Sequence, residues 1–177
     1  NLKTTLDLNE DNFIEKMNPI YEAIKRVSTN DLTKNKSTIG FVGAPWTLLV
    51  YMINKKSPKL KLTDSFYNDT NLLNEILFVI EKFLKIHIKN QIKNGAEVIQ
   101  IFDSWAGLVN EKDISKYIYD PTSSIVEYVK SLNVPVICFP RNIKDYKKYC
   151  EIVKPDAVCI DYEISPMKIV KEIKIPV

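Results

Sequence analysis

The residues best suited to ligand chemistry stand directly after an apolar run in the middle of the chain. Residues 98–102 (VIQIF) are largely apolar, and an acid, a hydroxyl and an indole follow at Asp103, Ser104 and Trp105. A short apolar run is typical of a buried parallel strand. Ligand sites of α/β folds collect where such strands end. We therefore expect a strand over 98–102 and a candidate site at its carboxyl end.

Ser104 has no partner that would make it a nucleophile. The sequence lacks a G-x-S-x-G turn, and His87 is its only histidine. His87 falls within the apolar stripe of a long expected helix, so we interpret it as a packed residue rather than a catalyst. Ser104 is then best interpreted as a hydrogen-bond donor to a ligand. Asp103 either orients Ser104 or faces the cleft itself.

A second candidate lies in residues 43–47 (GAPWT), where an expected strand turns into a helix that starts at Pro45. Free backbone N–H groups at a helix start attract anions. The alternative, which we favour from the residues alone, is a tight turn with Trp46 as packing. Tyr51 follows on the same helix. Its hydroxyl either meets a partner in the core or reaches the cleft and binds a ligand carboxylate.

Asp161 and Glu163 follow a further expected strand, over 157–160. They either line the site or belong to an ordinary loop, and the residues alone leave both interpretations open. The sequence has no H-x-C, no H-E-x-x-H and no paired cysteines, so it does not predict a metal site. It has no glycine-rich phosphate loop.

Strands and helices are expected to alternate along the whole chain. The expected helices cover 11–27, 45–53, 69–94, 113–132, 145–153 and 166–173; the expected strands cover 38–44, 98–102, 134–139 and 157–160, with 175–177 as the opening of another and loops at 28–37 and 54–63. Such alternation favours a parallel sheet, either a doubly wound sheet or a (β/α)8 barrel. A complete barrel needs eight strands and about 250 residues. We expect residues 1–177 to be a single α/β domain and a fragment of a longer chain, with both sheet arrangements open from the residues alone.

The composition excludes several classes of protein. The chain has 177 residues, 45% of them hydrophobic, with a net charge of +3 and only two arginines, Arg26 and Arg141. Lysines spread along helix faces are usually solvated, so we expect no nucleic-acid partner. No segment approaches the roughly 18 apolar residues of a membrane span. Three cysteines without a C-x-x-C pair fit a reducing cytoplasm.

Several motifs together resemble the uroporphyrinogen decarboxylase family. They are residues 40–47 (GFVGAPWT) with the following Tyr51-Met52, residues 91–107 ending in IFDSWAG, and Ile160-Asp161-Tyr162, which usually reads Leu-Asp-Trp in the family. The motifs keep the family's order and spacing from residue 38 to residue 177.

The resemblance implies that residues 1–177 are the central portion of a (β/α)8 TIM barrel, truncated at both ends. The whole barrel would use no cofactor and no metal and would form a cytoplasmic homodimer. Such an enzyme removes CO2 from the four acetate side chains of uroporphyrinogen III and yields coproporphyrinogen III for haem synthesis. By motif, Tyr51 and Ser104 would donate hydrogen bonds to the substrate, Phe102 would line the pocket, and Asp103 would be a further substrate-binding residue. The family's Arg-rich motif, pyrrole-facing Asp and late His motif match nothing in this chain. We therefore expect no catalytic residue here and no activity from these residues alone.

Two other functions remain open. Cobamide-dependent methyltransferases share the same barrel but hold zinc with His and Cys, and the missing H-x-C weighs against them. The other alternative is a non-catalytic barrel remnant that serves binding or assembly.

Overall fold

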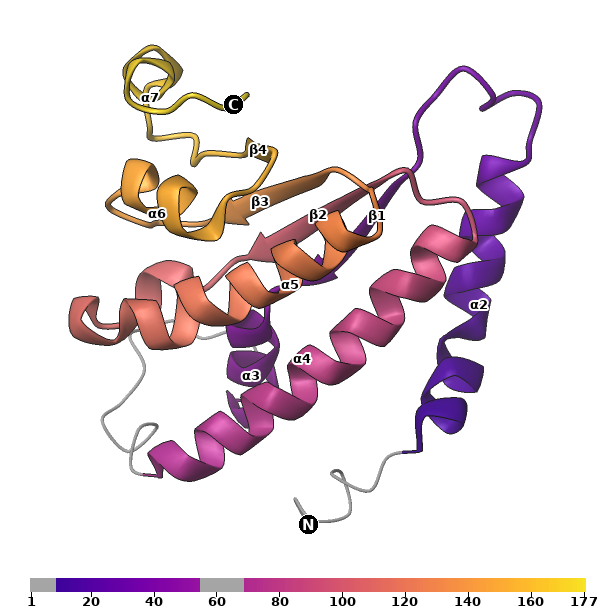
Figure 1. Ribbon diagram of the computed structural model, residues 1–177, viewed down its shortest axis with the longest axis horizontal. Helices are drawn as coiled ribbons and strands as arrows, with labels where there is room; N and C mark the ends of the chain where they lie inside the picture. The colour runs from indigo at the N-terminus through magenta and orange to yellow at the C-terminus, as the bar shows by residue number, and fades with distance from the viewer. Residues whose placement is uncertain (1–8, 55–68) are drawn as a thin grey trace.

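Helices and strands alternate along the chain in the computed structural model, which describes residues 9–54 and 69–177 (Figure 1). The elements are α2 (Glu10–Ser28), β1 (Ile39–Gly43), α3 (Pro45–Asn54), α4 (Thr70–Lys93), β2 (Val98–Asp103), α5 (Asp120–Ser131), β3 (Val136–Pro140), α6 (Tyr146–Val153), β4 (Ala157–Val158) and α7 (Pro166–Glu172). This order confirms the expected alternation. The expected loop at 54–63 lies outside the described residues beyond Asn54.

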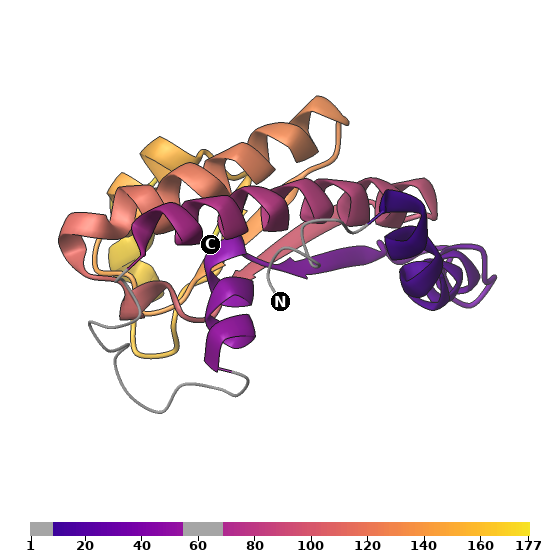
Figure 2. The same ribbon diagram turned by 90° about the horizontal axis from the view of Figure 1, so that it is seen from below.

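The strands form one parallel sheet in the order β1-β2-β3-β4. In this register Gly43 pairs with Phe102, and Phe102 pairs with Phe139. Helices α4 and α5 lie along one face of the sheet (Figures 1 and 2). Because all four strands run parallel, their carboxyl ends lie along one edge of the sheet.

Burial alternates along each strand and separates the two faces of the sheet. In β2 the side chains of Ile99, Ile101 and Asp103 are buried beneath the helices, while their neighbours are only half-buried. On the opposite face Phe41 is 66% exposed. A doubly wound sheet would be covered by helices on both faces. Sequential strand order with helices on one face is instead the arrangement of a (β/α)8 barrel, whose interior is the open face.

The long helix α4 has defined ends because the sequence supplies a cap for each of them. The Asp69 side chain accepts a hydrogen bond from the backbone N–H of Leu72 at 2.9 Å. Gly95 follows the helix at φ +109°, a conformation that favours glycine. The buried stripe of α4 includes Gln91, as expected, but Ile88 rather than His87 lies fully in the core.

Gln91 fixes helix α4 to strand β1. Its side-chain amide accepts a hydrogen bond from Phe41 N–H at 3.0 Å and donates one to Phe41 C=O at 3.1 Å. Gly40 leaves room for this amide, because an added Cβ would lie 2.7 Å from Gln91 Oε1. The amide thus pairs with the part-buried backbone N–H and C=O of Phe41.

The helix expected over 113–132 is only partly α-helical. A 3₁₀ turn at Glu111–Asp113 and a π-helical segment at Ser115–Tyr119 precede α5, which begins at Asp120. Pro121 explains the difference because it has no N–H to donate to the carbonyl four residues earlier. The backbone before it therefore takes another hydrogen-bonding pattern.

The last predicted strands are shorter than expected. β4 covers only Ala157–Val158, and residues 175–177 are not assigned as a strand. The backbone N–H of Val158 nevertheless donates to Pro176 C=O at 3.0 Å. The final segment thus lies beside β4. Among the described helices, none combines the length and apolarity that a membrane crossing requires.

Candidate functional site at the carboxyl ends of the strands

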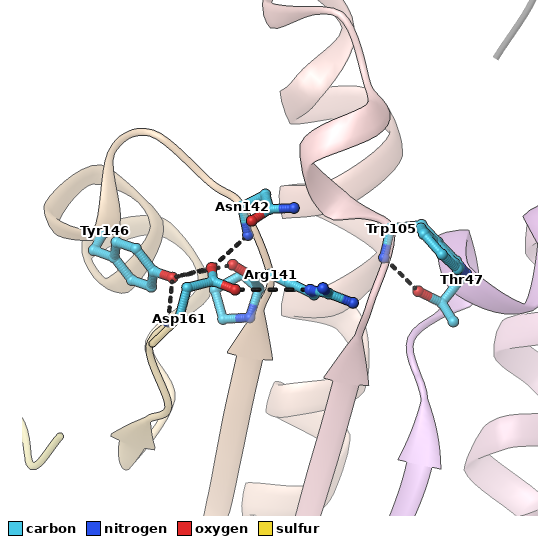
Figure 3. A network of polar contacts seen from close by, with 7 residues as sticks. Thr47, Trp105, Arg141, Asn142, Tyr146 and Asp161 are labelled. Atoms are coloured by element: carbon cyan, nitrogen blue, oxygen red, sulfur yellow. Dashed lines mark hydrogen bonds and ion pairs between the residues drawn. The ribbon is translucent and has the colours of Figure 1, made fainter. Parts of the chain in front are cut away.

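Thr47 ties the start of α3 to the end of β2. Its hydroxyl donates to Asp103 Oδ1 at 2.7 Å. The same hydroxyl accepts from the backbone N–H of Trp105 at 3.3 Å (Figure 3). The indole N–H of Trp46 donates to Trp105 C=O at 3.0 Å. Residues 43–47 therefore form a packed strand–helix junction that positions the turn after β2. Trp46 is fully buried, as the packing interpretation requires.

The carboxyl group of Asp103 is only 1% exposed and lies on the helix-covered face, toward Thr47. Burial raises its pKa to about 7, although the hydrogen bonds from Thr47 and from Trp105 N–H lower it in part. Its Oδ2 atom has no hydrogen-bond partner among the residues that the structure describes. Asp103 thus supports the turn that carries Ser104 and lies on the face opposite Phe102.

The structure brings Tyr51 to the turn that carries Ser104. The Tyr51 ring meets the Trp105 ring edge to face, with centroids 6.0 Å apart, and Tyr51 is 41% exposed. Ser104, the residue before Trp105, is half-buried. Tyr51, on α3, and Ser104 therefore both lie near the carboxyl end of β2.

Phe102 belongs to a row of three phenylalanines on the open face. Its ring centroid lies 6.1 Å from that of Phe41 and 6.3 Å from that of Phe139, both in near-perpendicular geometry. Of these three phenylalanines, only Phe102 was predicted from the sequence as a site residue. The other two join it because the strands pair in register, and only their alternate positions within two short apolar runs signalled this.

Asp161 connects the ends of β3 and β4. Its Oδ2 accepts hydrogen bonds from Asn142 N–H at 2.6 Å and from the Tyr146 hydroxyl at 3.0 Å (Figure 3). The Tyr146 oxygen in turn accepts from Asp161 N–H at 3.3 Å. Burial is the main cause that raises the pKa of Tyr146, so its hydroxyl stays protonated and donates. Asp161 is thus a buried anchor of two loops.

Arg141 lies between the ends of β2 and β4, and no role was predicted for it from the sequence. Its backbone N–H donates to Asp103 C=O at 3.1 Å, and its C=O accepts from Gly107 N–H at 3.0 Å. Its Nε lies 3.8 Å from Asp161 Oδ1. The backbone is therefore fixed at the sheet edge, while the side chain is 43% exposed there.

His87 lies away from this edge, between α2 and α4. Its Nδ1 is 3.0 Å from the Tyr21 hydroxyl, and burial lowers its pKa. A neutral imidazole nitrogen can accept a hydrogen bond from the Tyr21 hydroxyl, as expected for a packed residue. Within residues 9–54 and 69–177, no group of three or more His, Cys, Asp or Glu side chains is arranged to hold a metal ion.

The sequential parallel sheet, its single helical layer and its polar strand ends define part of a (β/α)8 barrel with a binding face at those ends. A family model described as "Uroporphyrinogen decarboxylase (URO-D)" matches residues 2–177. The chain belongs to the uroporphyrinogen decarboxylase family.

Curated relatives with this name agree. The protein from Rickettsia bellii is 38% identical over 158 residues, covering 86% of this chain and 46% of the relative. That from Orientia tsutsugamushi (strain Ikeda) is 36% identical over 162 residues, 88% of this chain and 47% of the relative. One from Campylobacter jejuni (strain RM1221) is 37% identical over 143 residues, covering 78% of this chain and 42% of the relative. The chain spans about half the length of the curated relatives it matches.

Proposed function

We propose that the complete protein containing these residues is a uroporphyrinogen decarboxylase. It would remove CO2 from the four acetate side chains of uroporphyrinogen III and release coproporphyrinogen III. The observation that carries this proposal is the arrangement at the end of β2, where the Tyr51 ring packs against Trp105 in the turn that follows Phe102 and carries Ser104. Membership of the family supports the same reaction.

In this proposal the described residues bind substrate and leave the chemistry to other parts of the barrel. The Tyr51 and Ser104 hydroxyls would donate hydrogen bonds to substrate carboxylates at the rim. The phenylalanine row would pack against the apolar face of the macrocycle. The reaction needs a proton on a pyrrole carbon, which makes the ring accept the electron pair of the acetate C–C bond when CO2 leaves. None of residues 1–177 is proposed as the proton donor.

We also propose that residues 1–177 form one domain that acts within a larger barrel. The open face with its exposed Phe41 and the coverage of the curated relatives support this arrangement. A further expectation is a cytoplasmic homodimer, which the family resemblance supports. The scattered lysines and the lack of a long apolar segment support the expectation that it binds neither nucleic acid nor membrane. Light scattering of the purified complete protein tests the dimer.

The decisive experiment is an assay of the complete protein with uroporphyrinogen III, following the porphyrin products as carboxylates are lost. We expect conversion to coproporphyrinogen III, and activity that survives treatment with a chelator because no metal takes part in the proposed reaction. Activity that is lost with chelator and restored by zinc would favour the methyltransferase alternative. A folded protein without any decarboxylation would favour the non-catalytic remnant.

A further inference from the structure

Arg141 occupies the same position after β3 as Ser104 does after β2. The last paired residues of these strands are Asp103 and Pro140, and Arg141 N–H continues the ladder by bonding to Asp103 C=O. Side chains alternate between the two faces of a sheet, and neighbouring strands lie about 4.8 Å apart. Ser104 and Arg141 each come two residues after a phenylalanine of the open face. The register therefore puts Ser104 and Arg141 at equivalent positions in neighbouring turns, each directly after a paired strand end.

The Arg141 guanidinium lies near the Asp161 carboxylate but contacts it through one nitrogen only. Asp161 already accepts two short hydrogen bonds on Oδ2, and Arg141 approaches its other oxygen only through Nε, at 3.8 Å. Within the described chain, Asp161 is the acid within ion-pair distance of Arg141. In Figure 3 the far end of the guanidinium extends away from Asp161, in the direction of the end of β2. Its remaining N–H donors are available to an anion.

We infer that Arg141 is a substrate-binding residue that holds a carboxylate side chain of the porphyrinogen beside Ser104. A guanidinium presents two parallel N–H groups that match the two oxygens of a carboxylate. Asp161 acts as the positioning residue, because its bonds to Asn142 and Tyr146 fix the carboxylate that Arg141 Nε faces. The inference rests on the proposed function, since the substrate supplies the carboxylates.

The test compares Arg141→Gln with Arg26→Gln in the complete protein. These are the two arginines of the chain, and Arg26 lies exposed on α2, which makes it a matched control. For uroporphyrinogen III we expect Arg141→Gln to raise KM about 10- to 100-fold, the range for losing a hydrogen bond to a charged group, with a much smaller effect on kcat. Arg141→Lys keeps the charge but loses the two parallel N–H groups, so its KM should lie between those of the wild type and Arg141→Gln. Arg26→Gln should leave both constants unchanged.

A purely structural role of Arg141 would give a different pattern. If it served only to neutralise Asp161, the double variant Arg141→Gln with Asp161→Asn would recover the wild-type KM, and the inference would be wrong. If the KM of the double variant stays raised, the binding role is supported. An unchanged KM in both Arg141 variants also overturns the inference while the proposed function stands. A wild-type protein that does not decarboxylate the substrate overturns the proposed function instead.

Discussion

The carboxyl of Asp103 shows how one buried group links stability to pH. Burial raises its pKa to about 7 from the ordinary value of 3.8, so between these pH values the folded protein retains a proton that the unfolded chain has already lost. The contribution to stability is therefore fully present below about pH 4 and is lost as the pH rises through 7.

Asp103→Asn tests this linkage because an amide carries no charge at any pH. We expect the free energy of unfolding of the wild type, relative to the variant, to fall by roughly 2–3 kcal/mol between pH 5 and pH 8. Urea unfolding of both proteins at the two pH values measures it. Parallel pH profiles would show that Asp103 titrates alike in the folded and unfolded chains.

The Thr47 hydroxyl forms hydrogen bonds to both Asp103 and the turn after it. Thr47→Val keeps the shape but leaves Asp103 Oδ1 and Trp105 N–H without the hydroxyl they share. We expect a loss of about 1–3 kcal/mol in the free energy of unfolding, the scale for buried unpaired polar groups. Thr47→Ser retains the hydroxyl and serves as the control. Equal stability of the two variants would rule out this role for the hydroxyl.

At the scale of elements, the contact between β1 and α4 depends on a missing side chain. A Cβ on Gly40 would lie 2.7 Å from Gln91 Oε1 and 2.9 Å from Ala96 Cβ. We expect Gly40→Ala to lower the melting temperature and to cost about 1–3 kcal/mol through overpacking. Gly43→Ala is the matched control, because its Cβ would meet only the movable side chains of Leu48 and Thr47, the nearest at 3.0 Å. A cost no larger at Gly40 than at Gly43 would contradict this account of the contact.

Elements with local signals were predictable and the others were not. The ends of α4 follow from Asp69 and Gly95, which act within one turn of the helix. The π-helical segment before α5 was missed because apolar periodicity continues across Pro121, whereas backbone hydrogen bonding does not. The expected β4 was too long because an apolar run does not show how much of it finds a strand partner.

The residues of the candidate site likewise fall into some that the sequence could predict and some that it could not. Tyr51, Phe102 and Ser104 could be proposed from motifs, because each lies in a contiguous run of recognisable residues. Thr47 and Arg141 were not assigned their contacts, because these depend on which strands pair and in what register. Residues brought together by strand pairing carry no signal in the spacing along the chain.

At the scale of the whole molecule, one side of the sheet carries apolar surface that the helices do not cover. Ile39 is 49% and Phe41 66% exposed. An apolar cavity of about 400 Å³ also opens between α2, β1, α3 and α4. Apolar surface of this kind marks a site of contact with other parts of a protein or with a partner.

Residues 1–177 expressed alone should therefore bind the dye ANS strongly. The full-length relative from Rickettsia bellii is the control, and we expect several-fold lower fluorescence from it at equal concentration, because a closed barrel covers this surface. Equal fluorescence from the two proteins would show that the open face is protected in the shorter chain as well.

The kinetics of Tyr51→Phe and Ser104→Ala in the complete protein test the substrate-binding edge most directly. Each change removes one hydroxyl that would pair with a substrate carboxylate, so each should weaken binding by about 1–3 kcal/mol, or about 5- to 150-fold in KM for uroporphyrinogen III. Unchanged KM and kcat in both variants would contradict the assignment of the end of β2 as a wall of the porphyrinogen site.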